Sequence, residues 1–280
     1  MVRRHDGKVA IITGASSGIG EACAKAFARS GMSVLMTARR GERLNAIASE
    51  IQANGGRAEV LVADAADRAL AGRLLDAAES HFGRFDIVLA NAGYGFDRPM
   101  HLMSEEELRT IFEVNFFAST DLVTHAARRL IAAKRPGHLI MTSSCLSKFS
   151  MPSFGAYAAT KAAQESVCRA MRFELAPHGI EVASVHPVTT SSEFFSTSAA
   201  RSGTRSAPLT DHAPKWIIQS PDRVARAILR CIERPRSEVW TSRIVQGASA
   251  LFTLCPWILD AVLRREAATR CSRTTAATRE

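Results

Sequence analysis

The sequence lacks paired cysteines. Its six cysteines are scattered over 280 residues, with no C-x-x-C spacing and no histidines at zinc-ligand intervals. This pattern excludes a disulfide framework and the common structural zinc sites, and it is typical of reduced thiols inside a cell. We therefore expect a cytoplasmic protein whose site holds no metal ion.

A secretory leader and a long uninterrupted apolar run are also missing. Residues 1–8 are polar, and the apolar stretch from Gly247 to Leu263 is broken by Pro256 and Asp260. It falls short of the roughly 20 apolar residues that a spanning helix needs. We expect no transmembrane anchor. The basic-flanked segment from Ala248 to Arg265 either makes peripheral contact with a membrane surface or packs on the body or on a neighbouring subunit.

Positive charge is present but does not form one face. There are 36 Lys and Arg against 27 Asp and Glu, a net charge of +9. The excess lies at Arg3-Arg4, Arg39-Arg40 and Arg264-Arg265, far apart in the sequence. We expect no nucleic-acid partner.

Short apolar, β-branched runs alternate with helical patterns along the chain, which predicts an α/β fold: a Rossmann-type doubly wound parallel sheet of about seven strands flanked by helices. The predicted strands are Val9–Thr13, Val34–Thr37, Val60–Ala63, Ile87–Ala90, His138–Thr142, Val182–His186 and Glu238–Ser242. The predicted helices are Glu21–Ser30, Glu42–Asn54, Ala69–Phe82, Glu105–Ala133, Ala156–His178 and Pro221–Glu233.

One catalytic domain over residues 1–246 accounts for this pattern. Within it, residues 189–220 are rich in Ser, Thr, Gly, Pro and Ala, too long a stretch for an ordinary connection, so we interpret it as a substrate lid, with a plain surface loop as the alternative. Residues 247–280 form a C-terminal extension: an apolar segment, then a basic tail that we expect to be disordered.

A glycine-rich turn joins the first predicted strand to the first predicted helix. Backbone amides and a helix N-terminus meet there, which favours an anionic group such as a dinucleotide pyrophosphate. Gly14 and Gly18 allow the turn and close backbone approach, and Gly20 lets helix and strand pack tightly. The cofactor-binding residues predicted in this turn are Gly14, Ser16, Ser17, Gly18, Ile19 and Gly20.

Tyr157 and Lys161 stand four residues apart on a predicted helix and so project from one face. Hydride transfer to a carbonyl needs a proton donor beside the oxygen and a charge that stabilises the donor's conjugate base. A tyrosine beside an ammonium, helped by the positive nicotinamide of an oxidised cofactor, supplies both. The pair alone is a weak signal, because it occurs by chance on many helices.

These motifs together resemble the short-chain dehydrogenase/reductase family over about Gly7 to Ser242. The resemblance rests on the order of G-x-x-x-G-x-G, Asp64 after strand three, Asn91-Ala92-Gly93 after strand four, and the Y-x-x-x-K pair. It implies that Ser144, thirteen residues before Tyr157, hydrogen-bonds the substrate oxygen. It also implies that Asn115 holds a water that connects Lys161 to solvent. The further cofactor contacts that it implies are Asp64, Ala65, Asn91, Ala92, Gly93, Tyr157, Lys161, Pro187 and Thr189.

The end of the second strand decides between NAD and NADP. Ala38 stands where NAD-selective relatives carry Asp, and two arginines follow it. A guanidinium binds phosphate with two hydrogen bonds. We therefore expect NADP(H) to be preferred, with NAD(H) also usable, Arg39 as the main contact with the 2′-phosphate and Arg40 assisting. The alternative is that both arginines form a solvated helix cap.

Two positions depart from the family pattern. Ala90 replaces the first Asn of Asn-Asn-Ala-Gly, a mild change, and Val188 replaces the Gly of Pro-Gly after strand six. Val188 does not readily adopt positive φ, so we expect the loop that closes over nicotinamide to take another path. Either Thr189 or Ser192 remains available for the carboxamide.

An apolar pocket favours a lipophilic substrate, such as a steroid, retinoid or fatty ketone or alcohol, although aromatic residues near a site are equally common in cores. The candidate pocket residues are Tyr94, Ser144, Cys145, Leu146, Phe149, Phe154, His186, Phe194 and Phe195. A homodimer or homotetramer is expected from the resemblance. The alternatives are a reductase of polar sugar or keto substrates and a non-catalytic dinucleotide-sensing regulator. The intact Asn, Ser, Tyr and Lys set disfavours the regulator.

Overall fold

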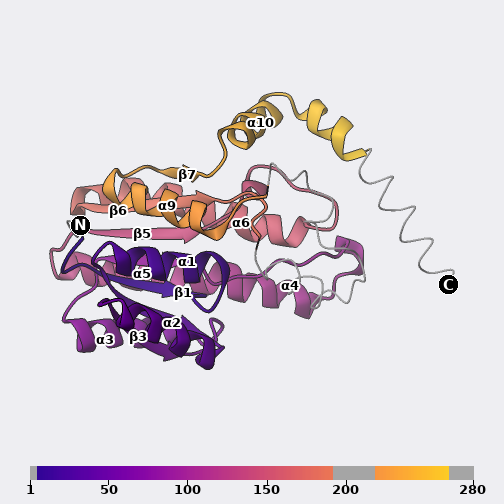
Figure 1. The fold of residues 1–280 in the computed structure, drawn as a ribbon. Helices are drawn as coiled ribbons and strands as arrows, with labels where there is room; N and C mark the ends of the chain where they lie inside the picture. The colour runs from indigo at the N-terminus through magenta and orange to yellow at the C-terminus, as the bar shows by residue number, and fades with distance from the viewer. Residues whose placement is uncertain (1–4, 192–217, 265–280) are drawn as a thin grey trace.

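A computed structural model describes residues 5–191 and 218–264. Seven parallel strands form one sheet in the order β3-β2-β1-β4-β5-β6-β7 (Figure 1), which confirms the predicted doubly wound sheet. The strands are β1 Val9–Thr13, β2 Ser33–Ala38, β3 Arg57–Val62, β4 Ile87–Ala90, β5 Gly137–Thr142, β6 Ile180–His186 and β7 Glu238–Trp240.

Helices cover both faces of the sheet (Figure 1). The labelled α-helices are α1 Gly18–Arg29, α2 Gly41–Ala53, α3 Leu70–Phe82, α4 Glu105–Phe112, α5 Ala118–Ala132, α6 Gly155–Leu175, α9 Pro221–Glu233 and α10 Arg243–Leu254. A further helix over Pro256–Arg264 follows α10. Short turns of other helix types are η1 Met100–Leu102, η2 Glu113–Phe117, η3 Cys145–Ser147 and η4 Ala176–His178.

Alternation of side chains along the strands divides the core into two layers. In β1, Ala10 and Ile12 join the cluster that contains α1, α2 and α9, whereas Val9 and Ile11 join the cluster with α3, α5 and α6. All five residues of β1 are buried, as expected for a parallel strand covered on both faces. The strand β1 lies inside the sheet between β2 and β4, and the glycine turn begins at its carboxyl end.

The predicted helix ends also hold. Ser104 and Glu107 form the capping box at the start of α4. Gly83 and Gly179 have the left-handed conformation after α3 and η4, and Gly31 has φ of 102° after α1.

Several boundaries differ from the predictions. The strand β3 begins at Arg57, three residues before the predicted Val60. It is an edge strand and therefore tolerates the charged side chains of Arg57 and Glu59, which interrupt the apolar run by which a strand is recognised in the sequence. The helix α10 spans Arg243–Leu254 and so runs without a break across residue 247, where the sequence analysis placed the start of the C-terminal extension.

Most of the predicted lid lies outside the described residues, but its two ends are described. Thr190 and Gln219 pair as an isolated parallel bridge, so the chain on either side of residues 192–217 meets beyond the end of β6. Val188 has no positive φ, as the sequence predicted for a β-branched residue.

Candidate active site

The glycine turn after β1 leaves no room for side chains. A Cβ atom on Gly20 would lie 2.3 Å from the carbonyl oxygen of Gly14, and one on Gly14 would lie 2.9 Å from Cα of Ala92. Gly14 and Gly18 also have φ of 66° and 58°, which favours glycine. Ser17 precedes α1 in an extended conformation and makes no side-chain cap. The turn therefore has the form that accepts a phosphate at a helix N-terminus, which fits a dinucleotide.

The turn after β4 is tied to this loop. Thr13 Oγ1 accepts hydrogen bonds from the backbone N–H groups of Asn91 and Ala92, both at 2.9 Å. A Cβ on Gly93 would lie 3.0 Å from Asn115 Oδ1 and 3.5 Å from Lys161 Nζ. The predicted cofactor contacts on β1 and β4 thus adjoin two of the predicted catalytic side chains.

The two arginines after β2 contact different side chains. The Arg40 guanidinium donates to Ser17 Oγ at 2.6 Å and to Ser16 Oγ at 3.1 Å, within the glycine turn. Arg39 Nη1 lies 3.8 Å from a carboxylate oxygen of Asp64, and its side chain is 59% exposed. The Arg40 guanidinium therefore lies on the glycine turn, whereas the Arg39 guanidinium lies beside the connection that follows β3.

Asp64 and Ala65 begin the connection after β3. The Asp64 carboxylate accepts a hydrogen bond from the Ala66 N–H at 3.0 Å, so it caps its own turn. Ala65, Thr13 and Ala92 line one groove of about 600 Å³ that continues along α3 and α5. Ile19, predicted in the same set, is a half-buried packing residue at the start of α1.

Tyr157, Ser144 and Lys161 come together, as the sequence predicted. The Tyr157 hydroxyl is hydrogen-bonded to the Ser144 side chain, and all three side chains are buried. Ser143 points the other way, since its hydroxyl donates to the Lys161 carbonyl at 2.9 Å. The strand's alternation therefore selects Ser144 as the serine beside the phenol.

Burial shifts both titratable groups toward their neutral forms. It raises the pKa of Tyr157 well above its ordinary value, an effect that the Ser144 hydrogen bond partly opposes. It lowers the pKa of Lys161 to about 7. Lys161 Nζ lies 5.7 Å from the centroid of the Tyr157 ring and donates to the Thr142 carbonyl at 2.7 Å. In the protein alone the phenol is thus protonated, and a phenolate needs additional positive charge.

Asn115 lies in a π-helical turn that interrupts the single helix predicted over Glu105–Ala133. This turn, η2, separates α4 from α5, and π turns occur often at functional sites. The Asn115 amide is fully buried: its Oδ1 accepts from Tyr94 N, and its Nδ2 donates to the Tyr94 carbonyl, both at 2.9 Å. Asn115 therefore fixes the backbone after β4.

Gln164 is a site residue that the sequence analysis missed. Its Oε1 accepts from Lys161 Nζ at 3.0 Å, and its Nε2 donates to the Asn115 carbonyl at 2.6 Å. A side-chain amide thus links the Lys161 ammonium to the backbone of Asn115. The spacing Tyr157, Lys161, Gln164 places all three on one helix face, so a polar residue on that face was the available signal.

His186 is a correction to the predicted pocket. It has no exposed surface, stacks on Trp240 with 4.6 Å between ring centroids, and so cannot contact a substrate. Its Nδ1 lies 3.0 Å from the Ser144 carbonyl, which only accepts, so Nδ1 carries the proton. Its Nε2 accepts from Ser184 at 2.9 Å. His186 therefore supports the backbone of Ser144 from behind.

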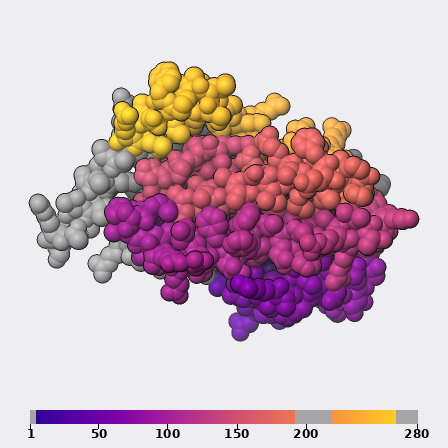
Figure 2. All heavy atoms as spheres, turned by 180° about the vertical axis from the view of Figure 1, so that it is seen from behind, coloured from indigo at the N-terminus to yellow at the C-terminus, as the bar shows by residue number. Residues whose placement is uncertain are grey.

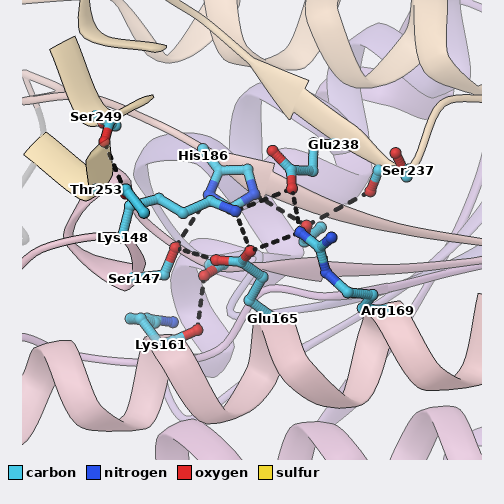
Figure 3. A network of polar contacts seen from close by, with 12 residues as sticks. Ser147, Lys148, Lys161, Glu165, Arg169, His186, Ser237, Glu238, Ser249 and Thr253 are labelled. Atoms are coloured by element: carbon cyan, nitrogen blue, oxygen red, sulfur yellow. Dashed lines mark hydrogen bonds and ion pairs between the residues drawn. The ribbon is translucent and has the colours of Figure 1, made fainter. Parts of the chain in front are cut away.

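A charged network surrounds His186 (Figure 3). Lys148 binds the carboxylates of Glu165 and Glu238, and Arg169 lies 2.8 Å from Glu238. The ligand-type atoms of Glu165, His186 and Glu238 lie within 4.8 Å of one another, as they would around a metal ion. The Lys148 ammonium already contacts both carboxylates, so the network carries its own cation.

The other predicted pocket residues fall into three groups. Tyr94, Leu146 and Phe154 pack in the small apolar cluster that contains Tyr157. Cys145 is buried beside Ser144, and its N–H donates to the Pro187 carbonyl at 3.1 Å. Phe149 packs edge-on against Phe252 of α10. The remaining predictions, Ser192, Phe194 and Phe195, lie outside the described residues.

The chain is similar to known oxidoreductases. Residues 8–202 match the family described as short chain dehydrogenase. The A-factor type gamma-butyrolactone 1'-reductase (1S-forming) of Streptomyces virginiae is 31% identical over 242 residues, which cover 86% of this chain and 94% of that protein.

Two solved structures have the same fold. A metagenomic short-chain oxidoreductase in complex with NADP is 30% identical with a TM-score of 0.70 and covers 85% of this chain and 97% of that one. A short chain dehydrogenase/reductase from Burkholderia phymatum in complex with NAD is 23% identical with a TM-score of 0.82, covering 91% and 96%.

Lys161→Met is expected to stabilise the protein in the absence of dinucleotide, because it removes a buried ammonium. The folded pKa of about 7 lies below the ordinary 10.5, so the unfolded chain binds more protons between these values. The stability of the unsubstituted protein should therefore rise with increasing pH over that window, by at most about 1.4 kcal/mol per pH unit. The difference in unfolding free energy from Lys161→Met should be largest below pH 7 and shrink toward pH 10.5.

Denaturant unfolding across this pH range measures the difference. Lys8→Met, which removes a solvent-accessible ammonium before β1, is the matched control. A difference between wild type and Lys161→Met that stays constant with pH would contradict the buried-ammonium assignment.

Gln164→Leu should shift the pH dependence of alcohol oxidation. Loss of the amide oxygen removes a hydrogen bond to a charged group, worth about 1.5–3 kcal/mol, so Lys161 gives the phenolate less support. The inflection of kcat/KM should move to higher pH by on the order of one unit. Gln52→Leu removes a hydrogen bond from a side-chain amide to the Ala58 carbonyl, far from the site, and should leave the inflection in place. A folded Gln164→Leu protein with an unshifted inflection would assign Gln164 to packing alone.

Proposed function

This chain belongs to the short-chain dehydrogenase/reductase family and is an oxidoreductase that interconverts an alcohol and a carbonyl with an NAD(P) dinucleotide. From this premise we propose that it prefers NADP(H) and acts on a lipophilic substrate, with Tyr157 as general acid and base. The observation that supports the assignment of Tyr157 is its buried hydroxyl, hydrogen-bonded to Ser144 beside Lys161. No other phenol is placed this way, because the chain has only two tyrosines and Tyr94 packs beneath Tyr157.

The chemistry divides between cofactor and chain. When bound, the dinucleotide gives or takes the hydride. In reduction, the Tyr157 hydroxyl donates its proton to the carbonyl oxygen while Ser144 Oγ holds that oxygen by a hydrogen bond. In oxidation, the Tyr157 phenolate takes the proton of the substrate hydroxyl. Lys161, held by Thr142 and Gln164, supports the phenolate when its amine is protonated.

The residues after β2 support the preference for NADP. The Arg40 guanidinium contacts Ser16 and Ser17 of the glycine turn, the Arg39 guanidinium lies beside Asp64, and no acidic residue occupies position 38. A 2′-phosphate carries two negative charges or nearly so, and a pair of arginines neutralises it with directed hydrogen bonds. Asp64, the nearest carboxylate to Arg39, caps its own turn and so competes only weakly for that guanidinium.

Apolar surroundings of Tyr157 support a lipophilic substrate. Tyr94, Phe96, Phe154 and Leu146 pack with Tyr157 in one apolar cluster, and the charged groups beside it are Arg98, over the Phe96 ring, and Lys161. The relative from Streptomyces virginiae is a gamma-butyrolactone reductase by name, which agrees with a substrate of low charge. A sugar or a small keto acid would leave its hydroxyl or carboxylate groups unpaired in such a site.

A substrate screen that follows NADPH absorbance tests the function. Medium-chain ketones should be reduced with higher kcat/KM than sugars or small keto acids. Tyr157→Phe keeps the ring and removes the proton donor, so it should lower turnover about 10²–10⁴-fold.

Better turnover of sugars would replace the lipophilic proposal, and near wild-type turnover by Tyr157→Phe would remove Tyr157 from the mechanism. Dinucleotide binding without turnover of any compound would favour the sensing regulator.

Arg39→Ala and Arg40→Ala should each lower the ratio of kcat/KM with NADPH to that with NADH, by about tenfold for loss of one charge-assisted pair. Steady-state kinetics with both cofactors on one substrate measures the ratio. Arg29→Ala, at the far end of α1, is the control and should leave the ratio unchanged. If neither Arg39→Ala nor Arg40→Ala changes the ratio, the two arginines are a solvated cap.

A further inference from the structure

Exposed apolar side chains gather at the C-terminal end of the described chain. Ten large hydrophobic residues are exposed in residues 5–191 and 218–264, and five of them lie within positions 243–264. These are Ile244, Leu251, Leu254, Trp257 and Val262. Figures 1 and 2 show that this segment forms a projection on the outside of the molecule, beyond the helices that cover the sheet. Half of the exposed apolar side chains thus belong to one short projecting element.

The projection consists of two helices that meet at a sharp bend. The helix α10 is followed by a second helix over Pro256–Arg264, and the two axes differ by 106°. No single helix among the described residues is long and apolar enough to cross a membrane, although this bent pair passes that test of length and composition when taken together. Either arm is shorter than the roughly 20 residues of a spanning helix.

Two faces of α10 have different surroundings. Ser249 is buried against the body, and Phe252 packs edge-on against Phe149 with 5.6 Å between ring centroids. On the other side, Ile244, Leu251 and Leu254 follow at helical spacing and are 68%, 46% and 80% exposed. The body therefore holds α10 by one face and leaves an apolar stripe uncovered.

The charges of this segment are few and placed at its ends. Arg243 and Arg264 flank the pair, and Asp260 is the only acidic residue between them. Trp257, 69% exposed, lies at the bend, and Trp is a side chain that prefers the boundary between water and lipid. Basic ends, an exposed Trp and an apolar stripe are the features of helices that lie in a membrane interface.

We propose that α10 and the helix Pro256–Arg264 form a docking surface for a lipid bilayer with anionic headgroups, along which both helices lie without crossing it. Leu254, Trp257 and the stripe enter the region between headgroups and acyl chains, and Arg243 and Arg264 contact lipid phosphates. A fluid apolar layer accommodates side chains on both arms of a 106° bend. A second copy of the chain would need a surface of matching shape, and it would offer one Asp260 for two arginines.

Docking also has a consequence for the substrate, and this consequence rests on the proposed function. Phe149, which contacts Phe252, lies five residues after Ser144, and Leu146 of the same segment packs in the cluster around Tyr157. The docking helix is thereby joined to the segment that borders the phenol. A lipophilic ketone or alcohol dissolved in the bilayer would reach the site close to where the protein contacts the membrane.

Co-sedimentation of the full chain with vesicles tests the docking surface. Vesicles of phosphatidylcholine mixed with phosphatidylglycerol should carry the protein down, and vesicles of phosphatidylcholine alone should carry less. The double substitution Leu254→Ser with Trp257→Ser changes only exposed side chains, so it should keep the fold and lower vesicle affinity at least about tenfold. Phe173→Ser, which alters a side chain 74% exposed on α6, is the matched control and should bind as the wild type does.

Three results would overturn the proposal: wild type that stays in the supernatant, a double variant that binds as tightly as wild type, or a dimer that becomes monomeric in the double variant without any vesicle binding. The last result would assign the stripe to a second copy. Turnover of a soluble ketone is measured in parallel without vesicles and should be equal in wild type and the double variant. Failure of docking then leaves that turnover intact, whereas failure of the proposed function abolishes turnover and leaves sedimentation unaffected.

Discussion

The burial of Lys161 is the constraint on which the rest of the site depends. An ammonium with 3% of its surface exposed loses most of its hydration, and only directed hydrogen bonds from its surroundings replace it. The Thr142 carbonyl at the end of β5 and the Gln164 amide on α6 provide two of them. The ends of the strands, the π turn and α6 must therefore keep their relative positions for the charge to stay beside Tyr157.

The fold meets this demand by joining elements that are distant in sequence. Gln164 holds Lys161 and the Asn115 carbonyl together, Asn115 holds the backbone at Tyr94, and Thr13 holds the N–H groups of Asn91 and Ala92. A chain of hydrogen bonds thus runs from the middle of α6 through η2 to the ends of β4 and β1. The glycine turn that would receive a dinucleotide and the phenol that would receive a substrate are set by the same contacts.

Much of the fold and part of the site could be predicted from the sequence, because they follow from the local pattern of apolar and polar residues. The strands read as short apolar runs, and the Tyr157 and Lys161 pair follows from helical spacing alone. The π turn at Asn115 could not be predicted, since its residues have ordinary helical character and the sequence does not show that the Asn115 carbonyl accepts a hydrogen bond from Gln164 on α6. His186 was mistaken for a pocket residue because a histidine before Pro187 gives no sign of which side it faces. Gln164 was overlooked because a lone amide on a helix is usually solvated.

The network behind Ser144 explains how the substrate side of the site is kept in place. Lys148 and Arg169 form ion pairs with Glu165 and Glu238. The two positive and two negative side chains of this partly buried network therefore neutralise one another. These contacts join the segment after Ser144 to α6 and to β7, while His186 holds the Ser144 carbonyl from beneath. Leu146 and Phe149 therefore extend from a segment fixed at both its backbone and its charge. Because Tyr157 lies on α6 as well, the same contacts join these apolar residues to the helix that carries the phenol. The positions of Leu146 and Phe149 are consequently coupled to the position of the phenol.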